Sequence, residues 1–247
     1  MSSKKAKIRV VIPNTSPDFL KAHRAELKEE FPDIEVVSLS SGPESLEDFL
    51  DEAVAAPDTV RLVKEAEEKG FDAVVISCFC DPAVDASREV VSIPVVGAGS
   101  ASLFVASSLG DRISVVTVLE ETIPSIENLV RLLGLTSNVV SVRASSIGVL
   151  EIEKDREKTL SALLRESLAA IKEERANVIA LGCTGMAGMD KALMEELKKR
   201  GYDVPVIDPA RAAVRWAEML VKLGLSSSKM KYRLSPPKKR TVSQMEF

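Results

Sequence analysis

The chain has 247 residues, of which 45% are hydrophobic, which is enough to build one large α/β domain or two small ones. The formal net charge of −4 argues against a nucleic-acid-binding protein, since such domains carry a basic excess. No apolar run approaches the roughly 20 residues that cross a bilayer, and the start lacks the apolar core of a signal peptide. We therefore expect a cytoplasmic protein without a membrane partner.

Short segments rich in valine and isoleucine alternate with helical segments, which is typical of parallel sheets flanked by helices. The predicted strands are Ile8–Ile12, Ile34–Leu39, Ala73–Ser77, Pro94–Val96, Ile113–Thr117, Val139–Val142, Val178–Leu181 and Pro205–Ile207. Predicted helices include Pro17–Phe31, Asp155–Arg175, Asp190–Arg200 and Pro209–Leu223, of which Asp155–Arg175 is expected to be the longest. Helices are expected to stop at Gly70, Gly134, Gly201 and Gly224.

The order of strands repeats within the chain. The segment Ala73–Cys78 matches Val178–Cys183, and three other landmarks recur in the same order at similar offsets. The repeat predicts two Rossmann-like α/β lobes related by a pseudo-twofold axis, each a short parallel sheet flanked by helices. We place them at residues 1–108 and 109–225, followed by a basic tail at 226–247. The last helix, Pro209–Leu223, is expected to cross back to the first lobe.

Cys78 and Cys183 stand at equivalent strand ends, where ligands bind in open parallel sheets. The pseudo-twofold axis would place the two thiols on opposite sides of a substrate. One thiolate can then remove a proton while the other thiol delivers one, as a two-base racemase requires. We expect the following helix N-terminus to lower the pKa of each thiol. Inert buried cysteines, in a binding protein without catalysis, remain the alternative.

Four motifs resemble those of the aspartate/glutamate racemase superfamily and are most similar to its hydantoin and allantoin racemase branch. They are Pro13–Ser16, Cys78–Pro82, Leu181–Ala187 and Val206–Pro209. The resemblance implies that Cys78 and Cys183 are the acid/base pair. It also implies that six residues line the substrate pocket: Asn14, Thr15, Phe79, Thr117, Thr184 and Gly185.

Two residues depart from the pattern of that branch. Cys80 stands where the branch has glycine, and Val118 stands where a second threonine follows Thr117. We expect Cys80 to be a packing residue; a redox-sensitive thiol and a different substrate are the alternatives. Val118 removes one hydroxyl donor from the pocket, so a polar group of the substrate is held differently or is missing.

The presumed strand-end turns contain no arginine or lysine. A dicarboxylic amino acid usually engages an arginine with each carboxylate, whereas hydroxyl, amide and backbone N–H groups suit a neutral ring. We therefore expect a cyclic ureide such as a hydantoin or allantoin, with aspartate or glutamate as the alternative. The alternative stays open because arginines outside these turns could reach the cleft: Arg88, Arg143 and Arg211.

The sequence contains only incomplete motifs for a dinucleotide site and for a metal site. Gly97-Ala98-Gly99 begins a dinucleotide-binding pattern, but Ser102 occupies the third glycine position. Three thiols at Cys78, Cys80 and Cys183 lack a fourth metal ligand. We therefore expect no cofactor and no metal.

The remaining features are expected to be structural. The only histidine, His23, lies on a predicted helix, where a structural role is expected. The basic tail Lys229–Arg240 is expected to be solvated or to clasp another subunit of a homo-oligomer.

Overall fold

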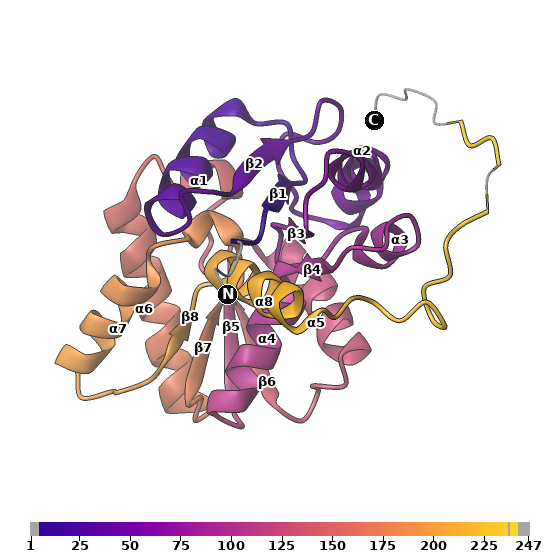
Figure 1. Cartoon of the computed structure of the whole chain (residues 1–247). Coiled ribbons are helices and arrows are strands. Elements are labelled where there is room, and N and C mark those ends of the chain that lie inside the picture. Colours follow the sequence, from indigo (N-terminus) through magenta and orange to yellow (C-terminus); the bar gives the residue numbers. More distant parts are fainter. Residues whose placement is uncertain (1–4, 237, 242–247) are drawn as a thin grey trace.

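The computed structural model describes residues 5–236 and 238–241. Within these residues the strands form two parallel sheets of four strands each (Figure 1). The first has the order β2-β1-β3-β4 and consists of β1 (Ile8–Ile12), β2 (Glu35–Ser38), β3 (Ala73–Ile76) and β4 (Val95–Gly97). The second has the order β6-β5-β7-β8 and consists of β5 (Ile113–Thr117), β6 (Val139–Ala144), β7 (Val178–Leu181) and β8 (Val206–Ile207). The predicted two-lobed α/β architecture is confirmed.

Equivalent strands occupy equivalent places in the two sheets, as the internal repeat predicts. Val11 of β1 lies opposite Ile76 of β3, and their counterparts Val116 and Leu181 lie opposite each other in the second sheet. The strands β1, β3, β5 and β7 are buried at every position. Their nearly continuous apolar sequences follow from this burial, because helices cover both faces of a parallel sheet.

The helices lie around these sheets, and none within the described residues is long and apolar enough to cross a membrane. The α-helices are α1 (Pro17–Glu30), α2 (Phe49–Glu68), α3 (Val84–Arg88), α4 (Ala98–Leu109), α5 (Ile123–Leu132), α6 (Arg156–Glu173), α7 (Asp190–Lys199) and α8 (Pro209–Leu223). Short 3-10 helices are η1 (Glu120–Thr122), η2 (Val149–Glu151) and η3 (Thr184–Met186).

The predicted helix starts and stops match the structure. The Ser16 hydroxyl accepts a hydrogen bond from the Phe19 N–H at the start of α1, directly before Pro17. The four glycines predicted to end helices take positive φ values just beyond them, in the left-handed region that glycine adopts without steric cost: Gly70, Gly134, Gly201 and Gly224.

The prediction that the helix near residues 155–175 is the longest was wrong. Helix α2 has 20 residues, against 18 for α6, and it continues through Pro57. A proline inside a helix removes one backbone hydrogen bond. The helix persists because it buries an apolar face that includes Ala55, Leu62 and Val63 beside the first sheet.

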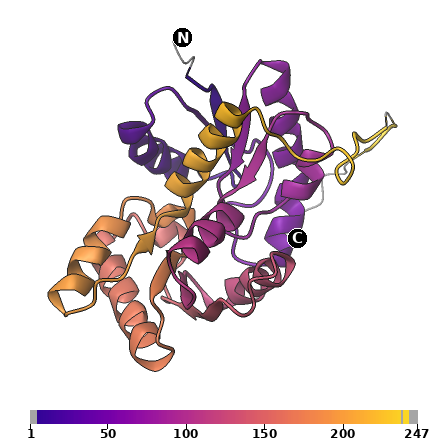
Figure 2. The same ribbon diagram turned by 60° about the horizontal axis from the view of Figure 1, so that its bottom comes forward.

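Helices α4 and α8 join the two lobes. Each follows the last strand of one lobe and packs against the sheet of the other: α4 against β7 and β8, and α8 against β3, β1 and β4. The two helices also pack side by side between the sheets (Figure 2). Many of their buried side chains are small, including Ala101, Ala106, Ala213 and Ala217, so the helices approach closely. The boundary between the two lobes at residue 108 stays a prediction.

The first part of the C-terminal tail packs against its own chain, near α3. Lys229 donates hydrogen bonds to the carbonyl oxygens of Arg88 and Val91, and the Tyr232 hydroxyl donates to the Asp85 carboxylate. This part of the tail therefore contacts its own chain through these side chains, and the clasping of another subunit stays a prediction. Residue 237 and residues 242–247 of the predicted tail lie outside the described residues, as do residues 1–4.

Candidate active site

Cys78 and Cys183 line the same small cavity, with a volume of about 30 Å³. Each cysteine follows a central strand by two positions, Cys78 after β3 and Cys183 after β7. The lobes therefore bring two distant thiols together at the carboxyl ends of their strands. The cavity is lined by Pro13, Asn14, Phe19, Leu46, Ser77, Cys78, Phe79, Cys80, Val118, Thr122, Val149, Gly182, Cys183 and Thr184.

The two cysteine loops are also tied to each other. The Thr184 hydroxyl, next to Cys183, donates a hydrogen bond of 3.0 Å to the carbonyl oxygen of Ser77, next to Cys78. The Ser77 hydroxyl lies 2.9 Å from Nε2 of His23 on α1. Burial lowers the pKa of His23 to about 4, so the imidazole is neutral at pH 7. His23 thus supports the loop, in agreement with its expected structural role.

The Cys183 thiol is held in its protonated form. Its side chain is 9% exposed, and burial raises its pKa to about 12, although the Gly185 N–H lies 3.4 Å from its sulfur and favours the thiolate. The expectation of a lowered pKa was wrong for Cys183, because desolvation outweighs the partial positive charge of the short helix η3. Cys183 is therefore suited to donate a proton.

Cys80 lies beside the half-buried Cys78 and adds a third thiol to the cavity wall. Its hydrogen bond to the Cys78 side chain and the loss of solvent around it raise the pKa of the Cys80 thiol well above its ordinary value. The nearby carboxylates of Glu52 and Asp81 raise it further. Cys80 therefore stays protonated and can donate its S–H to the sulfur of Cys78.

Three of the predicted pocket residues line the small cavity. The amide oxygen of Asn14 accepts a hydrogen bond from the Ser16 N–H, which leaves its amide nitrogen as the donor for a ligand. The Thr184 hydroxyl uses its proton toward Ser77, so its oxygen is left as an acceptor. Phe79 also lines the cavity, but its side chain is 1% exposed and belongs to the core around Leu103.

The other three predicted residues lie outside the cavity lining and support it. The Thr15 hydroxyl donates to the Pro43 carbonyl, and the Thr117 hydroxyl bonds to Thr122 and to the Gly182 carbonyl. Gly185 packs against the ring of Phe19, where a Cβ atom would lie 2.8 Å from a ring carbon. The lining residues that sequence reasoning missed are Gly182, which lies within the motif Leu181–Ala187, and five residues outside the motifs: Phe19, Leu46, Ser77, Thr122 and Val149.

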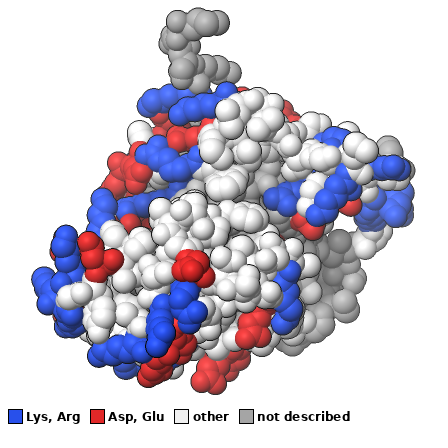
Figure 3. All heavy atoms as spheres, turned by 90° about the horizontal axis from the view of Figure 1, so that it is seen from below, with Lys and Arg blue, Asp and Glu red and all other residues white. Residues whose placement is uncertain are grey.

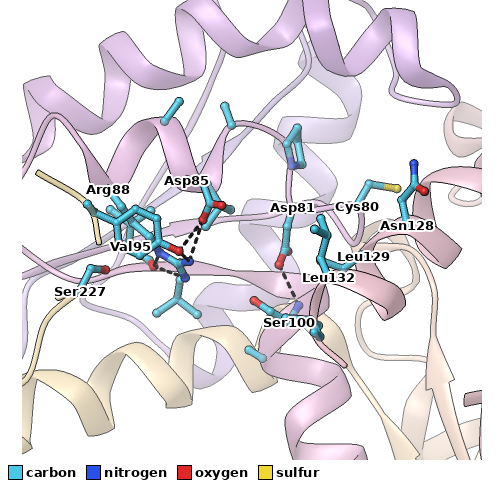
Figure 4. A pocket seen from close by; sticks show the side chains of 18 of the residues that line it. Cys80, Asp81, Asp85, Arg88, Val95, Ser100, Asn128, Leu129, Leu132 and Ser227 are labelled. Carbon is cyan, nitrogen blue, oxygen red and sulfur yellow. Dashed lines mark hydrogen bonds and ion pairs between the residues drawn. The ribbon is translucent and has the colours of Figure 1, made fainter. Parts of the chain in front are cut away.

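Asp81 fastens the Cys78 loop to helix α4 (Figure 4). Its two carboxylate oxygens accept hydrogen bonds from the N–H groups of Gly99 and Ser100, at 2.7 and 2.9 Å, in the first turn of α4. Burial raises the pKa of this carboxyl to about 6. Gly97 leaves room for the contact, because a Cβ atom there would lie 2.2 Å from the carboxyl carbon of Asp81.

Asp208 fastens the Cys183 loop to helix α8 in a related way. One oxygen of this N-cap residue accepts from the N–H groups of Ala210 and Arg211, and the other accepts from Gly188, beyond Cys183. In each lobe an aspartate thus joins the cysteine loop to the helix that packs on the other lobe. We call these two contacts the aspartate clamps.

Three arginines outside the strand-end turns bind other partners. Arg88 binds the Val95 carbonyl and Asp85, Arg143 pairs with carboxylates at 166, 173 and 174, and Arg211 pairs with those at 26, 30, 190 and 208. None lines the small cavity, and no other charged side chain does so among the described residues. The described residues also contain no group of three His, Cys, Asp or Glu side chains that could hold a metal ion.

Comparison with known proteins gives matches along nearly the whole chain. A family model described as Asp/Glu/Hydantoin racemase matches residues 8–217. A hydantoin racemase from Pseudomonas sp. (strain NS671) is 39% identical over 243 residues, which are 97% of this chain and 96% of that protein. The allantoin racemase from Klebsiella pneumoniae is 32% identical, with a TM-score of 0.87 over 97% of this chain and 96% of that chain. The allantoin racemase from Pseudomonas fluorescens is 36% identical, with a TM-score of 0.87 over 96% of this chain and 100% of that chain.

Proposed function

The chain belongs to the Asp/Glu/hydantoin racemase family, and on this premise we propose that it racemises a hydantoin or allantoin-type cyclic ureide without a cofactor. In this proposal Cys78 and Cys183 transfer protons to and from one carbon, from opposite faces. The observation that carries it is the meeting of two thiols from equivalent strand ends in one cavity. A protein that only binds a ligand would need neither thiol.

The proposed reaction starts with Cys78 as thiolate and Cys183 as thiol. The Cys78 thiolate takes the proton from the ring carbon, and the electron pair of the broken C–H bond moves into the adjacent carbonyl. Cys183 then gives its proton to the opposite face of that carbon and is left as thiolate. In the reverse direction, Cys183 starts as thiolate and Cys78 starts as thiol. The buried Cys183 thiol fits the role of acid in the first form.

Uncharged polar groups in the small cavity match the hydrogen-bonding groups of a ureide ring. Such a ring presents carbonyl oxygens and N–H groups in one plane. The amide nitrogen of Asn14 can donate to a carbonyl oxygen, and the Thr184 oxygen can accept from a ring N–H. An aspartate or glutamate substrate would instead place two carboxylates among uncharged side chains, which is unfavourable without an arginine or lysine.

Deuterium exchange tests this proposal directly. The protein is incubated in deuterium oxide with single enantiomers of 5-substituted hydantoins, allantoin, aspartate and glutamate at equal concentrations. Proton NMR follows exchange at the reacting carbon, and polarimetry follows loss of optical rotation. We expect exchange and racemisation of the ureides. Exchange of aspartate or glutamate with every ureide inert would contradict the ureide assignment but not the two-thiol mechanism.

We also propose that the protein is a homo-oligomer that uses the exposed face of α4. This helix contains no charged residue, and Phe104 and Leu109 on it are 39% and 56% exposed. In Figure 3 a broad uncharged area lies between Lys, Arg, Asp and Glu residues, without a large patch of one charge. We expect light scattering to give a multiple of 26.7 kDa for the wild type and a smaller assembly for Leu109→Lys. A monomeric wild type would contradict this proposal.

A further inference from the structure

A second, larger cavity lies beside the small cavity that contains the two catalytic thiols. Its volume is about 590 Å³, and it is bordered by α2, α3, α4, α5 and α8 (Figure 4). Sites for small molecules typically measure ~300–1,000 Å³, whereas a cavity of about 30 Å³ holds little more than one water. The small cavity alone therefore cannot accommodate a ring together with a substituent.

Cys80 stands between the two cavities. Of the described residues that line either cavity, Cys80 alone lines both. On the side of the small cavity its neighbour is the catalytic Cys78. On the side of the large cavity it lies beside α5, near Asn128, Leu129 and Leu132 (Figure 4). The Cys80 side chain is therefore part of the wall that separates the reacting centre from a space that already exists.

We propose, resting on the proposed function, that the large cavity receives the substituent on the reacting carbon and that Cys80 limits the size of that substituent. The part of the large cavity beside Cys80 fits an uncharged, apolar substituent, such as an aromatic or branched arm, whereas Asp85 and Arg88 line a part farther from Cys80 (Figure 4). Leu129 and Leu132 supply apolar contacts, while Glu52 and Asp81 make this side of the cavity unfavourable for an anionic arm.

The size of the Cys80 side chain is the property that the experiment varies. Cys80→Gly removes the wall, and Cys80→Ser keeps a side chain of similar size and hydrogen-bonding ability. For wild type and both variants, kcat/KM is measured with 5-methylhydantoin and 5-benzylhydantoin. We expect Cys80→Gly to raise the ratio of benzyl to methyl kcat/KM by about tenfold or more, and Cys80→Ser to change it by less than about threefold.

A blocking substitution tests whether the benzyl group enters the large cavity. Asn128 lines the large cavity but not the small one, so Asn128→Phe in the Cys80→Gly background should fill the new space. We expect it to return the benzyl-to-methyl ratio to the wild-type value. Glu127→Phe is the matched control, because Glu127 is the exposed neighbour on α5 and lines neither cavity; it should leave the raised ratio in place.

The outcomes separate this inference from the proposed function. A folded Cys80→Gly variant with an unchanged ratio, or a raised ratio that Asn128→Phe does not reverse, would overturn the role of Cys80 while racemisation stands. If the wild type turned over neither these hydantoins nor allantoin, the proposed function would fail, and calorimetric binding of 5-benzylhydantoin to wild type and Cys80→Gly would then test the role of Cys80. Binding at least tenfold tighter to Cys80→Gly than to wild type would support the proposal that Cys80 limits the size of the substituent, and equal affinity would overturn it.

Discussion

At the scale of single residues, the thiols of Cys78 and Cys183 are equivalent in sequence but not in environment. Cys78 is half-buried and lies beside the S–H donor Cys80, whereas Cys183 is 9% exposed and its pKa is raised to about 12. A two-base racemase needs one thiolate and one thiol at the same time. The surroundings of Cys183 hold its sulfur in the thiol form that one partner of such a pair requires.

Replacing Cys78 or Cys183 should nearly abolish racemisation. We expect Cys78→Ser and Cys183→Ser each to lower kcat/KM by about 10³-fold or more, because at neutral pH a hydroxyl is a far weaker base than a thiolate and a far weaker acid than a thiol. Cys80→Ser should lower it by less than about tenfold for a small substrate. Polarimetry of each variant measures the effect. An inactive Cys80→Ser together with an active Cys78→Ser would refute the assignment.

Alkylation should also distinguish Cys78 from Cys183. At pH 8, iodoacetamide should modify the half-buried Cys78 and leave Cys183 unmodified, since a thiol with a pKa of about 12 is almost entirely protonated and its sulfur is buried. Peptide mapping by mass spectrometry identifies the labelled site. As a control, protein unfolded in guanidinium chloride should label at both positions. Equal rates at Cys78 and Cys183 in the folded protein would contradict the prediction.

At the scale of secondary-structure elements, the aspartate clamps hold the cysteine loops on α4 and α8. Asp81 and Asp208 each bind backbone N–H groups of the helix that packs on the opposite lobe. A shift of either helix relative to its loop would change the distance between the two sulfurs. The clamps therefore link the packing of the lobes to the geometry of the site.

We expect Asp81→Asn to impair catalysis by displacing the Cys78 loop. The two oxygens of Asp81 serve two different N–H groups, and an amide can accept at only one of these positions. A shift of about 1 Å in a catalytic group lowers rates by about 10²-fold, so kcat/KM should fall by ~10- to 100-fold. Asp33→Asn, at an exposed position between α1 and β2 that lines neither cavity, is the control and should keep most of the activity. The rate of Cys78 alkylation should change in Asp81→Asn only.

At the scale of the whole molecule, one hydrophobic core runs through both lobes. It contains Val10 and Val75 of the first sheet, Ile179 and Leu181 of the second, and residues of α1, α6, α7 and α8. His23 lies buried near this core, stacked on Phe19 at 5.7 Å between ring centroids. Protonation of His23 would place a charge in an apolar environment, so it should oppose folding of the whole chain.

The stability contributed by neutral His23 should be lost in acid. Its pKa is about 4 in the folded protein against 6.5 in the unfolded chain, so the unfolded state takes up the proton first as the pH falls from 6.5 to 4. The free energy of unfolding should fall by about 3 kcal/mol over this range from His23 alone. Asp81 has a raised pKa of about 6 in the folded protein, so the folded state takes up this proton before the unfolded state does. Its contribution therefore raises the free energy of unfolding as the pH falls from 6 to 3.8.

Comparison with a histidine-free variant isolates this contribution. His23→Gln can keep a donor near the Ser77 hydroxyl but cannot gain a proton. Guanidinium unfolding at pH 7 and pH 4 should show a larger loss of stability for wild type than for His23→Gln, with a difference of about 3 kcal/mol. Equal losses in the two proteins would show that His23 is not the titrating group.

The sequence by itself determined the strands, the internal repeat and the meeting of two thiols. Apolar runs define buried parallel strands, and repeated topology places equivalent strand ends at equivalent points, so Cys78 and Cys183 could be paired from spacing and motifs. Only the tertiary structure decided which side chains line the cavity, that Thr15 and Thr117 turn away from it, and that Cys183 stays protonated. These properties depend on burial and on contacts between distant segments, such as the packing of α4 on the second lobe. Local sequence patterns carry no information about such contacts, because the partners are fixed only when the chain is folded.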